Sequence, residues 1–145
     1  MPVSGLINNW KNITDVLKNK LSNEFGKKLP IYIGEGDYAD NQFLKILPTS
    51  YSLEEQHMTS NIREYLFDFI LYSTGGKSER ESLSAIMRII SRMESFVGNN
   101  RSISLSDGSS IFESSLTSYE FDEGSDVYKY IVNIEFTCMH YWNKT

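Results

Sequence analysis

The sequence is poor in the side chains that most often carry catalysis or bind metals. Its 145 residues contain one cysteine, Cys138, and two histidines, His57 and His140. A single cysteine excludes an internal disulfide, and a structural zinc site needs four ligands. Cys138 and His140 are two residues apart in an expected strand and face the same side, yet two ligands do not make a metal site. We interpret them as a core thiol beside a half-exposed ring, and nothing positions Cys138 against His57.

Recognisable motifs for phosphate binding and hydrolysis are also absent. The chain has no P-loop, no Gly-x-Gly-x-x-Gly segment and no Gly-x-Ser-x-Gly turn. Three carboxylates, Glu35, Asp37 and Asp40, share one glycine-containing loop and could surround a calcium ion, but their spacing fits no binding-loop pattern. We favour an ordinary exposed loop, which needs turn formers and solvated charge anyway. The sequence therefore predicts no enzyme, no cofactor and no metal site.

Long apolar runs are missing as well. No segment approaches the roughly twenty apolar residues that cross a bilayer, and the first residues lack a basic region followed by an apolar core. We expect a protein made in the cytoplasm that is neither secreted through a signal peptide nor inserted into a membrane. The net charge of -5 disfavours a general grip on nucleic acid, which needs an excess of lysine and arginine facing phosphate.

The composition is that of one folded domain over residues 1–145. Hydrophobic residues make up 40% of the chain and aromatic residues 13%, which is enough for a core at this length. The charge is uneven, with a basic set in the first helical region and an acidic set between positions 107 and 126. The basic set is Lys11, Lys18, Lys20, Lys27 and Lys28, and the acidic set is Asp107, Glu113, Glu120, Asp122, Glu123 and Asp126. The two sets are either solvated faces or the two halves of a head-to-tail contact between copies.

Two stretches have the three- and four-residue spacing of apolar side chains that predicts amphipathic helices. The first runs from Val3 to Phe25. The second opens with a capping box formed by Ser78 and Glu81 and is expected to end at Gly98.

The segment between these helices predicts three strands. Short strands at 29–34 and 43–47, the second closed by Pro48, are expected to form a hairpin. The polar stretch 51–60 shows no periodicity, and we expect an irregular connection or an exposed arm. The apolar run 62–72 fits helix or strand, but its aromatic and branched residues favour a strand.

The last third of the chain predicts further strands. A short strand at 103–105 and a longer run at 111–121 flank an Asp107-Gly108 turn, which is a hairpin signal. An alternating ribbon from Val127 to Trp142 then exceeds the roughly five or six residues of an ordinary strand. Part of it is expected to find partners outside the domain's own core. The predicted fold class is α+β, an antiparallel or mixed β-sheet with two main helices packed on one face.

The order of these elements resembles that of phage tail-terminator proteins of long-tailed phages. The run 65–73, the Gly75-Gly76 break and the helix that opens at Ser78-Glu79-Arg80-Glu81 are similar to the central strand and helix of that family. The short strand at 103–105 and the long strand pair at 111–121 and 128–138 continue the likeness. It covers about two-thirds of the chain, from Ile62 onward, and rests on element order and pattern.

The resemblance implies a virion structural protein that forms a homo-hexameric ring on a completed tail tube and joins it to the neck or head connector. Its partners would be copies of itself, the tail tube protein and the connector, and DNA would pass through without being specifically bound. Candidate contacts with neighbours or the tube are Glu35, Asp37, Tyr38, Asp40, Asp122, Glu123 and Asp126. Another neck, head-tail connector or sheath-capping component is the nearest alternative, and a small ligand-binding or catalytic domain is the alternative from another class.

Overall fold

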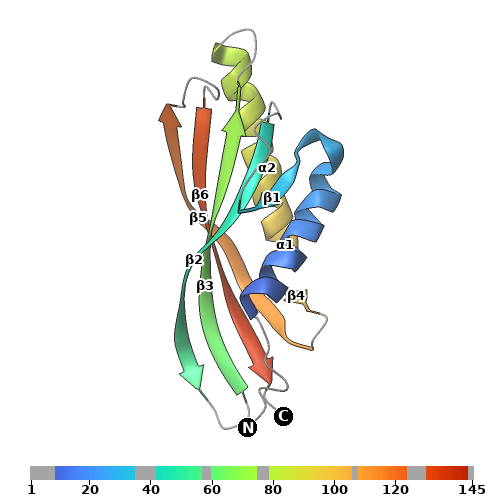
Figure 1. The fold of residues 1–145 in the computed structure, drawn as a ribbon, viewed down its shortest axis with the longest axis vertical. Coiled ribbons are helices and arrows are strands. Elements are labelled where there is room, and N and C mark those ends of the chain that lie inside the picture. Colours follow the sequence, from blue (N-terminus) through green and yellow to red (C-terminus); the bar gives the residue numbers. More distant parts are fainter. Residues whose placement is uncertain are drawn as a thin grey trace.

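The computed structural model is one mixed β-sheet with both helices on the same face (Figure 1). It describes residues 9–34, 42–56, 60–74, 79–105, 108–123 and 130–143. The helices are α1 (Asn9–Phe25), a short 3-10 turn η1 (Gly26–Lys28) and α2 (Glu79–Asn99). The strands are β1 (Ile31–Ile33), β2 (Gln42–Gln56), β3 (Ser60–Ser73), β4 (Ile103–Ser104), β5 (Ser110–Glu123) and β6 (Tyr130–Asn143). The predicted α+β class is confirmed.

The sheet order is β1-β2-β3-β6-β5-β4, and only the β1–β2 pair is parallel. Four strands of 14 or 15 residues make up most of the sheet. At about 3.3 Å per residue, each spans roughly 45 Å. The strands twist strongly along this length (Figure 1).

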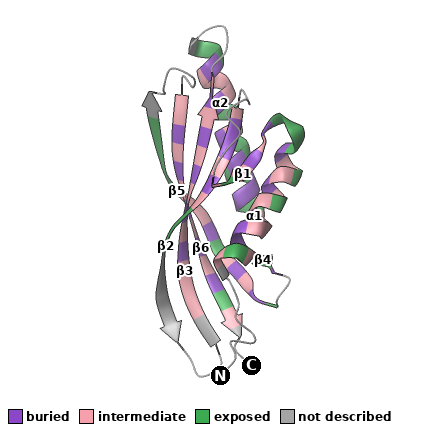
Figure 2. Ribbon diagram, in the orientation of Figure 1, coloured by how far each residue is buried: buried purple, intermediate pink, exposed green. Residues whose placement is uncertain are grey.

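The core lies between the sheet and the two helices. Along β6 every second side chain from Val132 to Cys138 is buried, and the intervening ones are half-buried (Figure 2). This alternation puts one face of the ribbon in the core, as its period of two predicts. Phe136 stacks on Phe69 of β3 with ring centroids 5.0 Å apart. The apolar face of α1, which includes Ile13 and Leu17, belongs to the same buried cluster.

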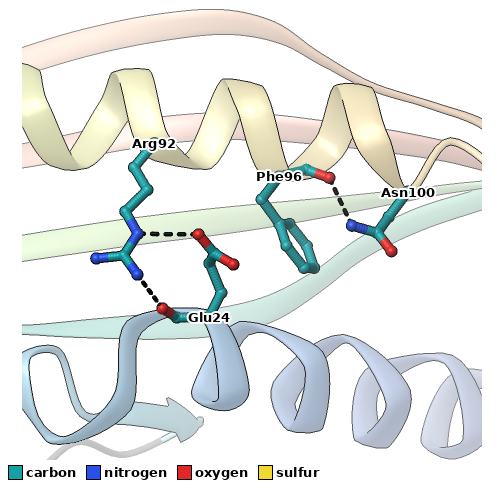
Figure 3. Close-up of polar contacts among 4 residues, drawn as sticks. All are labelled: Glu24, Arg92, Phe96 and Asn100. Carbon is teal, nitrogen blue, oxygen red and sulfur yellow. Dashed lines mark hydrogen bonds and ion pairs between the residues drawn. The ribbon is translucent and has the colours of Figure 1, made fainter.

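An arginine ties the two helices together (Figure 3). Arg92 of α2 donates from Nε to a carboxylate oxygen of Glu24 at 2.9 Å and from Nη2 to the backbone carbonyl of the same residue. Its guanidinium also lies over the Phe25 ring, 5.1 Å from the centroid. At the end of α2, the side-chain amide of Asn100 donates to the carbonyl of Phe96 at 2.9 Å. The contacts of Arg92 therefore fix the C-terminal turn of α1 against α2.

The predicted hairpin between the first two strands is wrong. β1 and β2 are parallel, with Ile31 beside Leu44 and Ile33 beside Ile46. The end of β1 is therefore level with Ile46 of β2. β2 itself begins at Gln42, four residues before Ile46. Those four residues correspond to about 13 Å, which is how far back along the sheet the chain returns between the two strands. Apolar content alone does not distinguish the two strand directions.

The prediction of an irregular segment at 51–60 is also wrong. β2 runs through Pro48 to Gln56 and pairs with β3 along its whole length, and β3 begins at Ser60. Irregularities in register between Pro48 and Ser50 and between Leu53 and Glu55 mark β-bulges. Pairing with a long neighbouring strand has overridden the local polarity, and a bulge is a place where a strand tolerates proline.

The other predicted elements are confirmed where the structure describes them. The run 62–72 is part of β3, and β4 and β5 form an antiparallel hairpin. Gly108 in its turn has a φ of +88°, a conformation that favours glycine. Helix α2 extends to Asn99, one residue past Gly98. The expected start of the first helix, at 3–8, and Ser78 of the expected capping box lie outside the described residues.

Candidate functional site

The outer side of β5 has an open segment, residues 115–123. β4 pairs with β5 only at Ser110 and Ile111, and the backbone N–H of Ser114 bonds the carbonyl of Arg101 at 3.2 Å. Within the described part of the chain, no strand pairs with the outer side of β5 beyond that point. A strand edge of this length presents a row of backbone donors and acceptors to any chain that approaches it.

Two transverse rows of the core end in exposed aromatic side chains on this open segment. Leu44, Leu71 and Val132 are fully buried side by side, and the next residue in the row, Phe121, is 50% exposed. One row further along, buried Ile134 is followed on β5 by Tyr119, which is 37% exposed. The apolar face of the sheet thus extends to the open edge of β5, where its side chains become exposed.

Backbone geometry places the N–H of Phe121 on the open side. Leu44 donates its N–H to the carbonyl of Pro30 at 2.9 Å, so its backbone polar groups point toward β1. Successive residues along a strand point their N–H and C=O groups to opposite sides. In an antiparallel ladder, two directly paired residues either both point these groups toward each other or both point them away from each other. Leu44 points away from its partner Leu71, so Leu71 points its groups toward β6 and its partner Val132 points back toward β3. Val132 therefore points away from its partner on β5, and Phe121 points its N–H away from β6 to the open side.

A groove of about 430 Å³ flanks the same segment, between β5 and the C-terminal part of α2. Leu116 and Tyr119 line it from the strand, and Val97 and Glu94 line it from the helix. The Tyr119 hydroxyl donates to a Glu94 carboxylate oxygen at 2.7 Å. Partial burial, followed by the hydrogen bond to Glu94 and its charge, raises the pKa of Tyr119 well above its ordinary value. The tyrosine hydroxyl therefore stays neutral and donates to Glu94, and this hydrogen bond links β5 to α2 across the groove.

The opposite edge of the sheet has an open segment of similar length on β2, residues 47–56. β1 pairs with β2 only from Leu44 to Ile46, so no described strand covers the outer side of β2 beyond Ile46. By the alternation that starts at Leu44, the backbone nitrogen of Pro48 faces this open side. Proline at an edge loses no hydrogen bond within its own sheet.

The sheet face opposite the helices carries a small acidic hollow. Asp68 of β3 and Glu135 of β6 lie directly opposite each other, and Glu120 of β5 lies beside them. The hollow has a volume of about 110 Å³. One Glu135 carboxylate oxygen accepts a hydrogen bond from the Thr117 hydroxyl at 2.8 Å. Like charges directly opposite in a ladder destabilise it, so the fold alone does not favour this choice of residues.

The pair considered for metal or thiol chemistry lies in the core. Cys138 and His140 face the helix side, as their spacing predicts, and each is 1% exposed. Burial, with a smaller contribution from the charge of Glu64, raises the pKa of the Cys138 thiol to about 12. Nε2 of His140 lies 3.0 Å from the hydroxyl of Ser109. The expectation of a half-exposed ring is wrong, because the β4–β5 turn region covers His140. A buried neutral thiol is a poor nucleophile.

Most of the predicted contact residues lie outside the described residues: Glu35, Asp37, Tyr38, Asp40 and Asp126. Asp122 and Glu123 are the last residues of β5 and pair with Ile131 and Tyr130 of β6. They therefore lie on the open segment of β5. The sequence prediction missed Tyr119 and Phe121, whose signal is an aromatic pair at period two near the end of a long strand.

The basic and acidic sets are only partly comparable, because four of the six acidic side chains lie outside the described ones: Asp107, Asp122, Glu123 and Asp126. Lys11 forms an exposed ion pair with Asp15 at 2.7 Å on its own helix. A cavity of about 330 Å³ between the end of α1 and α2 has Lys28, Arg88 and Arg92 among its lining residues. This cavity places a concentration of positive charge on the helix side, whereas the acidic hollow is on the opposite face.

No protein-family model matches this chain, and no curated protein matches it in sequence. Among the described residues, no group of three or more histidine, cysteine or acidic side chains is placed to hold a metal ion. The described helices include none that is long and apolar enough to span a membrane.

Proposed function

We propose that this chain is a virion structural protein, a tail terminator that forms a ring on the completed tail tube and joins the tube to the neck or head connector. The observation that supports this most directly is the pair of open segments at opposite edges of one sheet. Two different surfaces that complement each other give a heterologous contact, and heterologous contacts produce closed rings when the rotation between copies closes. The resemblance in element order supplies the biological setting.

Open edges of this length need an explanation in a folded domain. A monomer normally protects such edges with short strands, charges, bulges or a covering loop, because unpaired edges promote aggregation. Both edges here contain bulges, and β2 contains Pro48, but the two strands are long and no described strand covers their open segments. Here exposed Tyr119 and Phe121 extend the core surface to the edge of β5. A structural protein whose copies cover one another's edges has a use for this arrangement, whereas an isolated enzyme does not.

The acidic hollow supports passage of DNA without binding. Asp68, Glu120 and Glu135 alternate along their strands with the side chains that face the helices, so they lie on the opposite face of the sheet. If this face lines the central channel, every copy contributes negative charge to the wall, and like charge repels phosphate. The proposed partners are copies of the chain, the tail tube protein and the neck or head connector. The proposed location is the virion tail, after assembly in the host cytoplasm.

Buried Cys138 and His140 weigh against the catalytic alternative, since neither is presented to a substrate. The proposal is tested by locating the protein in purified virions, with labelled antibodies or by cryo-electron microscopy. We expect it at the head-proximal end of the tail tube. Virions made without it should lack joined heads and tails, and the tubes should vary in length. A position elsewhere in the neck would assign it to a connector, and absence from virions would refute a structural role.

A further inference from the structure

We infer that neighbouring copies pair the open segment of β2, residues 47–56, with the open segment of β5, residues 115–123, so that one antiparallel sheet runs through the ring. This inference rests on the proposed self-assembly and names the surface that performs it. The occupant of each open edge is a second copy of this chain, for reasons of length, direction and position.

The two open segments match in length. They contain ten and nine residues, which at about 3.3 Å per residue is roughly 30 Å of edge on each strand. Outside the bulges at 48–50, 53–55 and 116–118, a pairing over this length would satisfy the backbone groups on both edges that no described strand pairs. Pro48 lies at the start of the β2 segment and removes one donor there, so the pairing we infer is strongest beyond the bulge at 48–50.

The strand directions also match. Every neighbouring pair in the series β2, β3, β6, β5 is antiparallel, so β2 and β5 run in opposite directions. Rotation about a ring axis preserves the direction of each strand along that axis. The β5 strand of one copy therefore meets the β2 strand of the next in antiparallel orientation, which is the pairing that the sheet already uses internally.

The positions of the two segments along the sheet fit a tilted barrel. The open part of β2 lies beside residues 61–68 of β3, whereas the open part of β5 is level with residues 66–73. This displacement of five residues is about 17 Å along the strands, over four strands that occupy about 19 Å across them. The ratio corresponds to a tilt of roughly 40°, within the range at which strands of closed barrels lie.

The added strand would also complete the interrupted core rows. On the helix side, the side chains that end the rows are Phe121 and Tyr119, and both are substantially exposed. A strand docked at about 4.8 Å would place its own side chains beside them and remove apolar surface from water. If the ring has six members, this spacing and a tilt near 40° give a sheet-lined tube on the order of 50 Å across.

Three substitutions at adjacent positions test the edge. Phe121→Pro removes a backbone N–H that faces the open side, and Phe121→Thr removes the aromatic ring but keeps the N–H and suits a strand. Glu120→Pro removes an N–H that the same alternation turns toward β6. We expect the monomers of both Phe121→Pro and Phe121→Thr to fold. Phe121→Pro should self-associate about tenfold more weakly than Phe121→Thr. Glu120→Pro should destabilise the monomer itself.

Hydrogen exchange measured by mass spectrometry supplies a second readout on the wild-type chain. The backbone amides of peptides that cover 47–56 and 115–123 should exchange at least about tenfold more slowly in the assembly than in the monomer. Assemblies in which both segments exchange freely, or in which Phe121→Pro associates as well as Phe121→Thr, would overturn the edge pairing but leave the tail-terminator role standing. Protected edges in a protein that is absent from virion tails would refute the role and keep the pairing. A wild-type chain that stays monomeric even on purified tail tubes would refute both.

Discussion

Replacement of Asp68 by asparagine should stabilise the monomer. Asp68 and Glu135 lie directly opposite on β3 and β6, and Glu120 lines the same hollow. The Cβ atoms of directly paired residues are about 5 Å apart. Two like charges at that separation repel by about 0.8 kcal/mol in water and by about 3 kcal/mol at an effective dielectric constant of 20, which sets the upper range for this pair. Both side chains are half-buried, so solvent screens much of this. We expect a gain of about 0.5–1 kcal/mol in the free energy of unfolding.

Urea unfolding followed by tryptophan fluorescence measures this gain. With a slope of about 2 kcal/mol per molar urea, the midpoint should rise by roughly 0.3–0.5 M at low ionic strength. Most of the increase should disappear in about 1 M salt, where the screening length falls to roughly 3 Å. The protein concentration is kept below that at which copies associate, because assembly adds its own stabilisation.

A double-mutant cycle isolates the repulsion from other effects of the substitution. Glu135→Gln alone should also stabilise, and adding it to Asp68→Asn should give less than the sum of the two single effects. Strict additivity, a destabilising Asp68→Asn, or a gain that is equally large in high salt would each refute the argument. The hollow would then be held by contacts other than charge.

Three further predictions concern the core and the contact between helices. The Cys138 thiol, with its pKa raised to about 12, should resist alkylation at pH 8 in the native protein and react fully in urea. Because the folded state holds this proton more tightly than the unfolded state, the free energy of unfolding should fall as pH rises from about 9 toward 12. Rapid native alkylation would show that the thiol is accessible. Arg92→Ala should lower the free energy of unfolding by about 1 kcal/mol, since it removes an exposed ion pair, a hydrogen bond to a backbone carbonyl and a contact with Phe25. Arg92→Lys should recover only part of this, because lysine lacks the planar guanidinium that reaches the carboxylate and the backbone carbonyl of Glu24 from separate nitrogens and lies over the Phe25 ring. Equal melting temperatures for wild type and Arg92→Ala would contradict it.

The sequence predicted those parts of the fold in which local pattern and final environment agree. The period of two from Val132 to Cys138 and the helical spacing in 79–99 correspond directly to buried faces. The parallel direction of β1 escaped prediction because an apolar strand has the same pattern in either direction. The polar segment 51–56 escaped it because its strand conformation comes from pairing with β3.

The open edge of β5 was hidden for a different reason. Irregularities in register at 112–115 and 116–118 shift the strand from one face to the other, so the alternation in the sequence is broken between Ile111 and Tyr119. Glu113 in the first of these has a φ of +53°, a left-handed conformation that is uncommon for a side chain other than glycine. Which strand lies at an edge is also a property of the whole sheet order, and no local pattern encodes it.

The open edges and the acidic hollow constrain each other. If copies join edge to edge, the sheet must turn one face inward, and only two arrangements are available. With the helices inward, α1 and α2 would line and narrow the channel, and the acidic face would meet solvent, where its repulsion has no use. With the helices outward, the channel wall is the face that bears Asp68, Glu120 and Glu135. The repulsion that Asp68→Asn should relieve in the monomer would then act on passing phosphate, so the substitution should stabilise each copy while making the channel wall less repellent to DNA.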